Sequence, residues 1–322
     1  MSKPYVFVTR KLHDDAIKKL QEKFEVNVWP YDDVKVERDV LLKEVERADG
    51  ILTMLSDQID EQLLSRAKNV KVIANLAVGY DNIDIEAATK HNIIITNTPD
   101  ILKDTTADLT FALLLATARR IPESINYVKE GKWTSWSPFL LAGSDVHHKT
   151  IGIVGMGSIG EAIAKRATGF DMQILYHNRT RKPEAEKKLN AKYVSFDELV
   201  TESDFVVCMT PLTEETKDMF NEDVFKKMKK SAIFINTSRG GVVDEEALYR
   251  ALKNSEIKAA GLDVFKNEPI GADHPLLELD NVVALPHIGS ASFETRYNMM
   301  HLAVDNIISV LEGKDPITPV NK

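Results

Sequence analysis

Residues 151–164 read IGIVGMGSIGEAIA, an apolar run followed by the spacing Gly-x-Gly-x-x-Gly. This pattern predicts a strand that turns directly into an amphipathic helix, whose first N–H groups are free to bind phosphate oxygens. Gly155 permits the tight turn, Gly157 lets the backbone approach a pyrophosphate, and Gly160 lets helix and strand pack closely. The stretch therefore predicts a dinucleotide site, although a glycine-rich turn in a sheet that binds nothing would show the same glycines. The predicted contacts are Gly155, Met156, Gly157, Ser158, Ile159 and Gly160.

The next predicted strand ends in LYHNRTRK, residues 175–182, and this ending bears on the choice of nicotinamide cofactor. NAD-specific sites place an Asp or Glu about 20 residues after the glycines, where it binds the ribose 2′-hydroxyl. Here the segment holds no carboxylate and is rich in cations. Because a guanidinium suits bidentate contact with a 2′-phosphate, we expect NADP(H) to be preferred, with NAD(H) still possible. The expected contacts are Asn178, Arg179 and Thr180; the alternative is a solvated charged loop.

Short apolar runs alternate with amphipathic segments along the rest of the chain, which is typical of parallel sheets covered by helices. We expect an α/β fold with two Rossmann-like or flavodoxin-like domains, each a parallel sheet with helices on both faces. A last helix that crosses back would give domains of residues 1–100 plus 290–322 and residues 101–289. The predicted strands are 5–8, 25–29, 50–54, 70–75, 93–96, 151–154, 173–176, 205–208, 232–236, 259–262 and 282–284, and the predicted helices are 14–23, 37–48, 60–67, 84–90, 109–120 and 293–312.

The passage between the two domains holds two further signals. Thr105 and Asp108 have the spacing of a capping box, which would open the apolar helix 109–120. Residues 133–148 contain two tryptophans, a proline and little periodicity. We expect them to form a long loop that packs on another surface, with a partner subunit as one candidate.

Composition limits the classes of function. A length of 322 residues suits two domains, and a net charge of −8 argues against general nucleic-acid binding and gives no attraction to an anionic membrane. The N-terminus lacks the apolar core of a signal peptide and no apolar run could span a bilayer, so a cytoplasmic protein is expected. The single cysteine, Cys208, lies in an apolar run and is expected to be a buried strand residue. No metal site is expected, because the adjacent His147 and His148 could not easily share one metal.

Three later segments each run from an apolar strand into a loop that carries one charged or titratable side chain. They read FINTSRGGVVD from 234, AGLDVFKNEP from 260 and ALPHIGSAS from 284, and carry Arg239, Glu268 and His287. Ligand sites of open α/β sheets lie beyond such strand ends. Each residue also has a structural alternative: Arg239 could pair with Asp244, Glu268 could be a solvated loop charge, and His287 could cap a turn.

Together with the glycine fingerprint, these segments resemble the D-isomer-specific 2-hydroxyacid dehydrogenase family over essentially the full chain. The likeness is greatest to its glyoxylate/hydroxypyruvate reductase branch, because of residues 178–180, the loop at 133–136 and the segment 286–291. The resemblance implies an enzyme that reduces glyoxylate or hydroxypyruvate to a D-2-hydroxy acid with NADPH. Alternatives are another substrate, such as D-3-phosphoglycerate or D-lactate with NAD, or a non-catalytic protein that senses NAD(H).

The resemblance also implies roles that chemistry supports. His287 would give a proton to the nascent alkoxide, because imidazole titrates near neutral pH. Glu268 would bind the other ring nitrogen, fix the tautomer and favour imidazolium. Arg239 would hold the substrate carboxylate and polarise the carbonyl oxygen. The site would lie in the cleft between a substrate domain, residues 1–100 plus 290–322, and an NAD(P)-binding domain, residues 101–289.

Further residues match family positions. Backbone N–H groups of Val78 and Gly79 would bind the substrate carboxylate; the alternative is a plain turn at Gly79. A homodimer built on residues 101–148 is also implied, in which Trp136 would reach the neighbouring active site or would simply pack. The remaining expected contacts are Thr106, Thr210, Thr237, Asp263 and Gly289 for the cofactor and Ser290 for the substrate.

Overall fold

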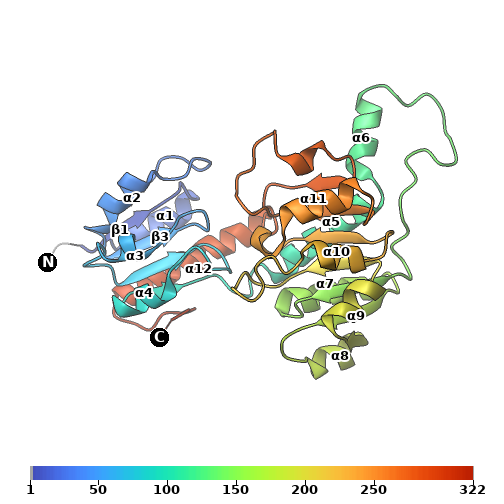
Figure 1. Ribbon diagram of the computed structural model, residues 1–322. Helices are drawn as coiled ribbons and strands as arrows, with labels where there is room; N and C mark the ends of the chain where they lie inside the picture. Colours follow the sequence, from blue (N-terminus) through green and yellow to red (C-terminus); the bar gives the residue numbers. More distant parts are fainter. Residues whose placement is uncertain (1–2, 322) are drawn as a thin grey trace. The chain divides into compact units, whose positions relative to one another are not determined.

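The computed structural model describes residues 3–321, and the chain divides into two compact units (Figure 1). The first unit comprises Met1–Leu102 and Ala291–Lys322, and the second comprises Lys103–Ser290. Each unit is built on one sheet whose strands are all parallel. The predicted α/β class with parallel sheets is therefore confirmed.

The first unit holds a five-stranded sheet in the order β2-β1-β3-β4-β5, which is the flavodoxin-like order. Successive side chains of a strand point to opposite faces, so Phe7 packs on one side of the sheet and Val6 and Val8 on the other. Helices α2, α3 and α4 cover the first side, and α1 and α12 cover the second. The strands are β1 (Tyr5–Val8), β2 (Glu25–Val28), β3 (Gly50–Thr53), β4 (Val72–Asn75) and β5 (Ile94–Thr96), and the helices are α1 (Asp14–Gln21), α2 (Arg38–Val45), α3 (Glu61–Leu64), α4 (Ile85–Lys90) and α12 (Phe293–Leu311).

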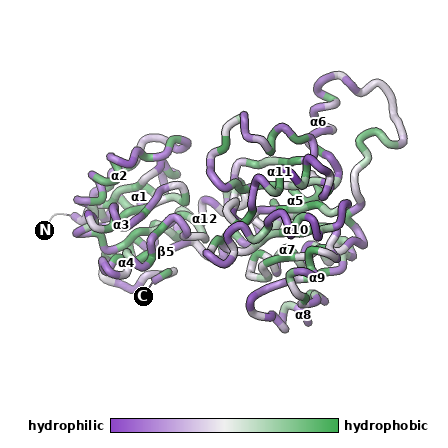
Figure 2. The backbone as a smooth tube through the Cα atoms, in the orientation of Figure 1, coloured by the Kyte–Doolittle hydropathy of each residue, from purple (hydrophilic) through white to green (hydrophobic). Residues whose placement is uncertain are grey.

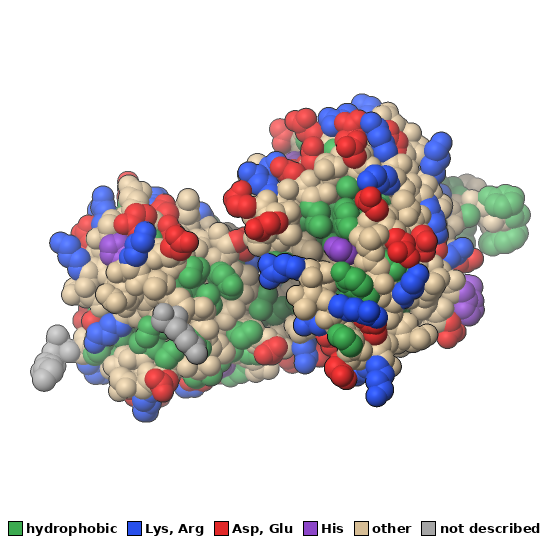
Figure 3. Space-filling view, turned by 60° about the horizontal axis from the view of Figure 1, so that its bottom comes forward, with side chains coloured by type: hydrophobic (Ala, Val, Ile, Leu, Met, Phe, Trp, Pro, Cys, Tyr) green, Lys and Arg blue, Asp and Glu red, His purple; other side chains and the backbone are tan. Residues whose placement is uncertain are grey.

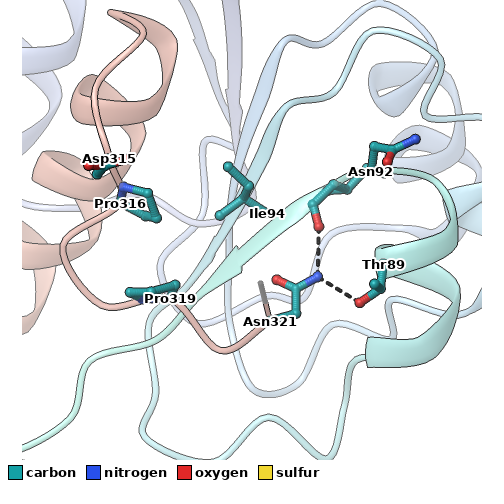
Figure 4. Close-up of a pocket in the computed structure, with 8 residues that line it drawn as sticks. Thr89, Asn92, Ile94, Asp315, Pro316, Pro319 and Asn321 are labelled. Atoms are coloured by element: carbon teal, nitrogen blue, oxygen red, sulfur yellow. Dashed lines mark hydrogen bonds between the residues drawn. The ribbon is translucent and has the colours of Figure 1, made fainter.

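The C-terminal segment closes the β5 edge of this sheet. The Val320 N–H donates to Ile95 O at 2.8 Å, and the Ile95 N–H donates to Asn321 Oδ1 at 2.7 Å. Asn321 Nδ2 in turn donates to Thr89 Oγ1 and to Ile93 O (Figure 4). These bonds satisfy backbone groups that an edge strand would otherwise leave unpaired.

The second unit holds a seven-stranded sheet in the order β12-β11-β10-β9-β6-β7-β8. The order reverses between β6 and β9, as in dinucleotide-binding sheets. Helices α5, α7 and α8 cover one face, and α9, α10 and α11 cover the other. The strands are β6 (Thr150–Val154), β7 (Gln173–His177), β8 (Ala191–Tyr193), β9 (Phe205–Cys208), β10 (Ile233–Asn236), β11 (Ala259–Leu262) and β12 (Val282–Ala284). The helices are α5 (Lys103–Ala118), α6 (Ile121–Lys129), α7 (Ser158–Thr168), α8 (Pro183–Leu189), α9 (Phe196–Glu202), α10 (Glu222–Lys227) and α11 (Glu245–Lys253), with short 3-10 turns η1 (Gly240–Val242) and η2 (Pro275–Glu278).

Helix α5 begins earlier than the sequence indicates, so the predicted capping box is wrong. The helix starts at Lys103, just after Asp100 turns the chain with a φ of 65°. Thr105 and Asp108 therefore lie inside the helix, where Asp108 Oδ1 accepts a hydrogen bond from Arg166 Nε at 2.6 Å. The predicted apolar character of α5 is correct, and Figure 2 shows the helix as largely hydrophobic.

Several elements of the second unit are absent from the sequence prediction: helices α6, α8, α9, α10 and α11 and strand β8. Strand β8 has three residues at the sheet edge, too few to show a period. Helix α6 follows α5 at once, because Arg120 adopts a left-handed conformation with a φ of 53° that separates the two. None of the α6 residues is buried. Residues 130–149, which follow α6, form neither helix nor strand, so the loop predicted at 133–148 lies within them. Figure 1 shows them leaving the body of their unit.

Cys208 is fully buried in β9 as predicted, and burial raises the pKa of its thiol. Among residues 3–321, no helix combines the length and the apolar character needed to cross a membrane.

Candidate active site

The loops that follow β6, β9, β10, β11 and β12 share the carboxyl edge of the second sheet, because all these strands are parallel. The predicted cofactor and catalytic residues, apart from Thr106 on α5, lie in these loops, in the turn after β7 or at the start of α7. Because the strand order reverses between β6 and β9, this edge has the crevice in which open α/β sheets bind ligands.

The glycine loop joins β6 to α7, and its three glycines face different surroundings. Gly155 has a φ of 110°, and a Cβ there would lie 2.5 Å from Met209 O. A Cβ on Gly160 would lie 2.2 Å from Gly155 O, whereas a Cβ on Gly157 would meet no protein atom within 4 Å. The fold itself thus requires glycine at 155 and 160, while glycine at 157 leaves open space in front of α7.

We expect Gly157→Ala to fold normally and to bind a nicotinamide dinucleotide about ten-fold more weakly or worse, because its methyl group would occupy the space left for a pyrophosphate. The matched variant Gly160→Ala should instead lower the melting temperature, because its methyl group meets backbone. Thermal melts and fluorescence titration would measure both. Unchanged dinucleotide affinity in Gly157→Ala would rule out this use of the loop.

The turn after β7 is tied to the glycine loop. The Met156 N–H donates to Asn178 Oδ1 at 2.6 Å. Arg179 and Thr180 are exposed, and no hydrogen bond or ion pair joins the Arg179 guanidinium to another residue of the described chain. Arg181 differs, because Glu186 accepts two hydrogen bonds from it at 2.7 Å and the pKa of Glu186 falls to about 2. Of the two arginines, Arg179 is the one whose guanidinium makes no hydrogen bond or ion pair with a described residue, although its charge helps to lower the pKa of Glu215.

Asp263, Gly289 and Thr106 lie together beyond β11 and β12. Asp263 is buried, and its Oδ1 accepts a hydrogen bond from the Ile288 N–H at 2.8 Å. Its Oδ2 has no hydrogen-bond partner among residues 3–321, and burial raises the pKa of this carboxyl. A Cβ on Gly289 would lie 3.3 Å from that Oδ2 and 3.4 Å from Thr106 Cγ2. A ligand with an N–H donor, such as a nicotinamide carboxamide, fits this unmet acceptor.

Thr210 and Thr237 line the strand ends between this cluster and the glycine loop. Thr237 Oγ1 lies 2.7 Å from Thr110 Oγ1 and donates to Met209 Sδ at 3.2 Å. The backbone of Thr210 lies against Gly155, since a Cβ on that glycine would be 2.9 Å from Thr210 N. The fold therefore brings the predicted dinucleotide contacts of both strand ends next to the glycine loop.

His287 and Glu268 form a close pair. His287 Nδ1 lies 2.6 Å from Glu268 Oε2, and the two side chains are 25% and 27% exposed. Glu268 Oε1 accepts a second hydrogen bond from the Phe265 N–H at 2.8 Å, so the carboxylate is held from two directions. His287 Nε2 has no hydrogen-bond partner in the described chain. The ring can therefore present Nε2 to a ligand while Glu268 holds Nδ1.

The backbone of His287 is in the left-handed region, with a φ of 54°. Few residues other than glycine and asparagine adopt this conformation readily, and such strain gathers at functional sites.

Arg239 follows β10 in a turn that packs on the Glu268 loop. Its carbonyl accepts a hydrogen bond from Asn236 Nδ2 at 3.0 Å, and its guanidinium donates to Ser238 O at 2.9 Å. A Cβ on Gly240, the next residue, would lie 1.9 Å from the carbonyl carbon of Phe265. Asp244, the alternative partner of Arg239, accepts a hydrogen bond from the Ala247 N–H and caps α11.

Glu245 is a residue of this region that sequence reasoning missed. Its Oε1 accepts a hydrogen bond from the Lys266 N–H at 2.6 Å, which fixes the loop that carries Glu268. In the sequence it reads as an ordinary acidic residue in the first turn of a helix, so no local signal indicates this contact.

The other predicted substrate residues are dispersed along the chain. Val78 and Gly79 lie in the first unit after β4, and Ser290 ends the second unit. Trp136 is 80% exposed in the segment after α6. Residues 3–321 contain no group of three or more His, Cys, Asp or Glu side chains that could hold a metal ion.

The chain is similar in sequence and in structure to known proteins. Residues 111–289 match the family model described as D-isomer specific 2-hydroxyacid dehydrogenase, NAD binding domain. A glyoxylate reductase of Pyrococcus horikoshii is 52% identical over 99% of this chain and 96% of its own length. The TT0316 protein of Thermus thermophilus has a similar structure, with a TM-score of 0.92, 46% identity and coverage of 98% of this chain and 99% of its own. The NADPH-dependent glyoxylate/hydroxypyruvate reductase of Sinorhizobium meliloti, solved in complex with NADP and malonate, has a TM-score of 0.85 and 33% identity, over 99% of this chain and 97% of its own.

Proposed function

Since the chain belongs to the D-isomer-specific 2-hydroxyacid dehydrogenase family and is an NAD(P)-dependent enzyme that reduces 2-keto acids, we propose that its substrates are glyoxylate and hydroxypyruvate and that it prefers NADPH. The products would be glycolate and D-glycerate. The relatives named glyoxylate reductase, which match along nearly the full chain, support this choice of substrate.

The proposed cofactor site runs along the carboxyl edge of the second sheet. Bound NADPH supplies the hydride that reduces the keto carbon. Residues 155–160 would hold the pyrophosphate, Thr210 would lie on the adenosine side, and Arg179 would bind the 2′-phosphate. Asp263, with its unpartnered Oδ2, would accept a hydrogen bond from the carboxamide, near Thr106, Thr237 and Gly289. The guanidinium of Arg179 makes no hydrogen bond or ion pair with a described residue, and this supports a preference for the phosphorylated cofactor.

Three side chains would act on the substrate. Nε2 of a protonated His287 would give its proton to the oxygen that was the keto oxygen, which becomes the hydroxyl of the product. Glu268 would accept the hydrogen bond from Nδ1 throughout, so that the ring keeps one orientation and its positive charge is stabilised. Arg239 would bind the substrate carboxylate and polarise the keto group. The N–H groups of Val78 and Gly79 would bind the same carboxylate, and Ser290 would lie beside the substrate.

The observation that carries the proposal is the pair of His287 and Glu268, which leaves Nε2 available at the same strand ends as the glycine loop. The test is a panel of 2-keto acids, including glyoxylate, hydroxypyruvate and pyruvate, assayed with NADPH and with NADH. Oxidation of NADPH by glyoxylate or hydroxypyruvate, faster than by the other keto acids, is the expected result. Failure to oxidise NADPH with either acid would refute the proposal.

We further propose that a second copy of the chain covers α6 and the segment after it. Seven large apolar side chains between residues 121 and 140 are at least 37% exposed. Figure 3 shows hydrophobic side chains gathered at the far right of the view, where the loop after α6 reaches farthest in Figure 1. Exposed apolar patches of this kind mark protein interfaces. Trp136 would then approach the partner's active site. The exposed residues are Ile121, Ile125, Val128, Trp133, Trp136, Phe139 and Leu140.

Light scattering should accordingly give a mass of two chains for the wild type. The double variant Trp133→Asp and Phe139→Asp should shift the mass toward one chain, because charges would replace apolar contacts in the interface. A wild type that remains a single chain at assay concentration would contradict the dimer.

A further inference from the structure

The backbone of residues 77–80, after β4 of the first unit, is held by its carbonyl groups. Ala77 O accepts a hydrogen bond from the Thr98 N–H at 2.9 Å. Val78 O accepts one from Asn97 Nδ2 at 2.8 Å, and Gly79 O accepts one from Asn75 Nδ2 at 2.9 Å. Three consecutive carbonyls are therefore bound by donors at the carboxyl ends of β4 and β5.

This arrangement fixes the direction of three N–H groups. A trans peptide is planar, and the C=O of one residue points opposite to the N–H of the next. Because the carbonyls of residues 77, 78 and 79 face the strand ends, the N–H groups of Val78, Gly79 and Tyr80 point away from them. No described residue accepts a hydrogen bond from any of these three N–H groups. Successive unpaired N–H groups are a favourable site for an anion.

The two asparagines that hold the carbonyls are themselves fixed. Asn75 is fully buried at the end of β4, and its Nδ2 also donates to Asn82 Oδ1 at 3.3 Å. Asn82 Nδ2 donates to the carbonyls of Met54 and Asp57, so the network reaches the loop after β3. Asn97 accepts a hydrogen bond at its carbonyl from Thr318 Oγ1 at 2.6 Å. The donors are thus anchored on neighbouring strand ends and on the C-terminal segment.

We propose that Asn75 and Asn97 are positioning residues for the reduction: their side-chain amides hold the carbonyls of Gly79 and Val78 so that the N–H groups of Tyr80 and Gly79 are presented to the carboxylate of the 2-keto acid. The Tyr80 N–H is a third donor beside those of Val78 and Gly79. This inference rests on the proposed function, because it names what orients the carboxylate site. An asparagine that served stability alone would support the loop without affecting substrate affinity in particular.

The test compares variants at Asn97 with a matched control. Asn97→Ala removes the donor, and Asn97→Asp keeps the shape but turns an acceptor toward Val78 O. Asn321→Ala is the control, because Asn321 also binds a backbone carbonyl beside β5, at the pocket of Figure 4, away from the loop. The measured quantities are KM and kcat for glyoxylate, the inhibition constant of oxamate, the Kd of NADPH and the melting temperature.

We expect both Asn97 variants to raise KM for glyoxylate and the inhibition constant of oxamate by roughly ten-fold, the loss typical of a hydrogen bond to a charged group. Their kcat should fall far less, because the carboxylate is bound alike in the ground and transition states. The Kd of NADPH should not change. Asn321→Ala should lower the melting temperature and leave KM at the wild-type value.

A KM and an oxamate constant that stay at wild-type values in the folded Asn97 variants would overturn the inference. The inference would also be overturned if Asn321→Ala raised KM as much as the Asn97 variants do, because the rise in KM would then reflect lost stability. Amide exchange of the wild type needs no variant: oxamate with NADPH should slow exchange at Gly79 and Tyr80, and unchanged exchange at both would also overturn the inference. If the wild type reduces neither keto acid, the proposed function itself fails. The outcomes above differ from that failure, because in them the wild-type enzyme is active.

Discussion

Replacing His287 by asparagine is expected to lower kcat for glyoxylate by roughly 10²–10⁴, the usual contribution of a general acid. Asparagine is the suitable replacement because it tolerates the left-handed backbone of this position, where φ is 54°. Its amide can still bond to Glu268, so the loop should keep its shape. The melting temperature and the Kd of NADPH should therefore stay near the wild-type values, which locates the loss in the chemical step.

The chain offers a matched control for this variant. His91 Nε2 lies 3.2 Å from Glu61 Oε1, an exposed histidine–carboxylate pair at the end of α4. His91→Asn removes an equivalent pair and should leave kcat unchanged. If the His287→Asn enzyme kept more than about a tenth of wild-type kcat, His287 would not be the general acid.

Replacing Arg179 by aspartate should lower kcat/KM with NADPH relative to NADH by about 100-fold or more. The variant loses the charge-assisted hydrogen bonds proposed for the 2′-phosphate and places a carboxylate beside that anion. The same carboxylate can accept a hydrogen bond from the 2′-hydroxyl of NADH, as in NAD-specific sites. Steady-state kinetics with both cofactors at saturating glyoxylate would give the ratio.

The control for Arg179→Asp is the same charge change elsewhere in the second unit. Arg250 is 48% exposed on α11, where it pairs with Glu222 and Glu246. Arg250→Asp should leave the cofactor ratio at the wild-type value. If Arg179→Asp also left the cofactor ratio unchanged, the preference for NADPH would have to arise outside the turn after β7.

The parts of the molecule that the sequence predicts well are those whose signals are local. The glycine spacing at 155–160 places a tight turn between β6 and α7, and the structure shows that two of these glycines face backbone at distances no side chain could share. The apolar runs likewise mark the inner strands of both sheets, because these strands are buried on both faces.

The sequence predictions fail where a local signal competes with tertiary contacts. The spacing of Thr105 and Asp108 suits a cap, yet α5 starts earlier and Asp108 binds Arg166 on α7. Strand β8 is too short to show a period, and its place depends on the strand beside it.

The positioning network of the first unit could not be predicted, because its contacts join distant parts of the chain. Asn97 and Thr318 are 221 residues apart, and only the fold brings them together. Within the sequence, Asn75 and Asn97 appear as ordinary polar residues at strand ends, for which turn formation is a sufficient explanation. The proposed catalytic residues carry more local signal, since each follows an apolar strand in a loop whose sequence resembles a known family.

The closure of β5 by residues 319–321 has a consequence for how copies of this protein can meet. An open strand edge is a template on which a foreign strand can add, and this is a common route to aggregation. In the first unit that route is closed at β5, and at the opposite edge β2 is only four residues long and begins with the exposed Glu25. Association through the β5 edge must therefore rely on side chains, which discriminate between partners. A ladder of backbone hydrogen bonds would not discriminate between them.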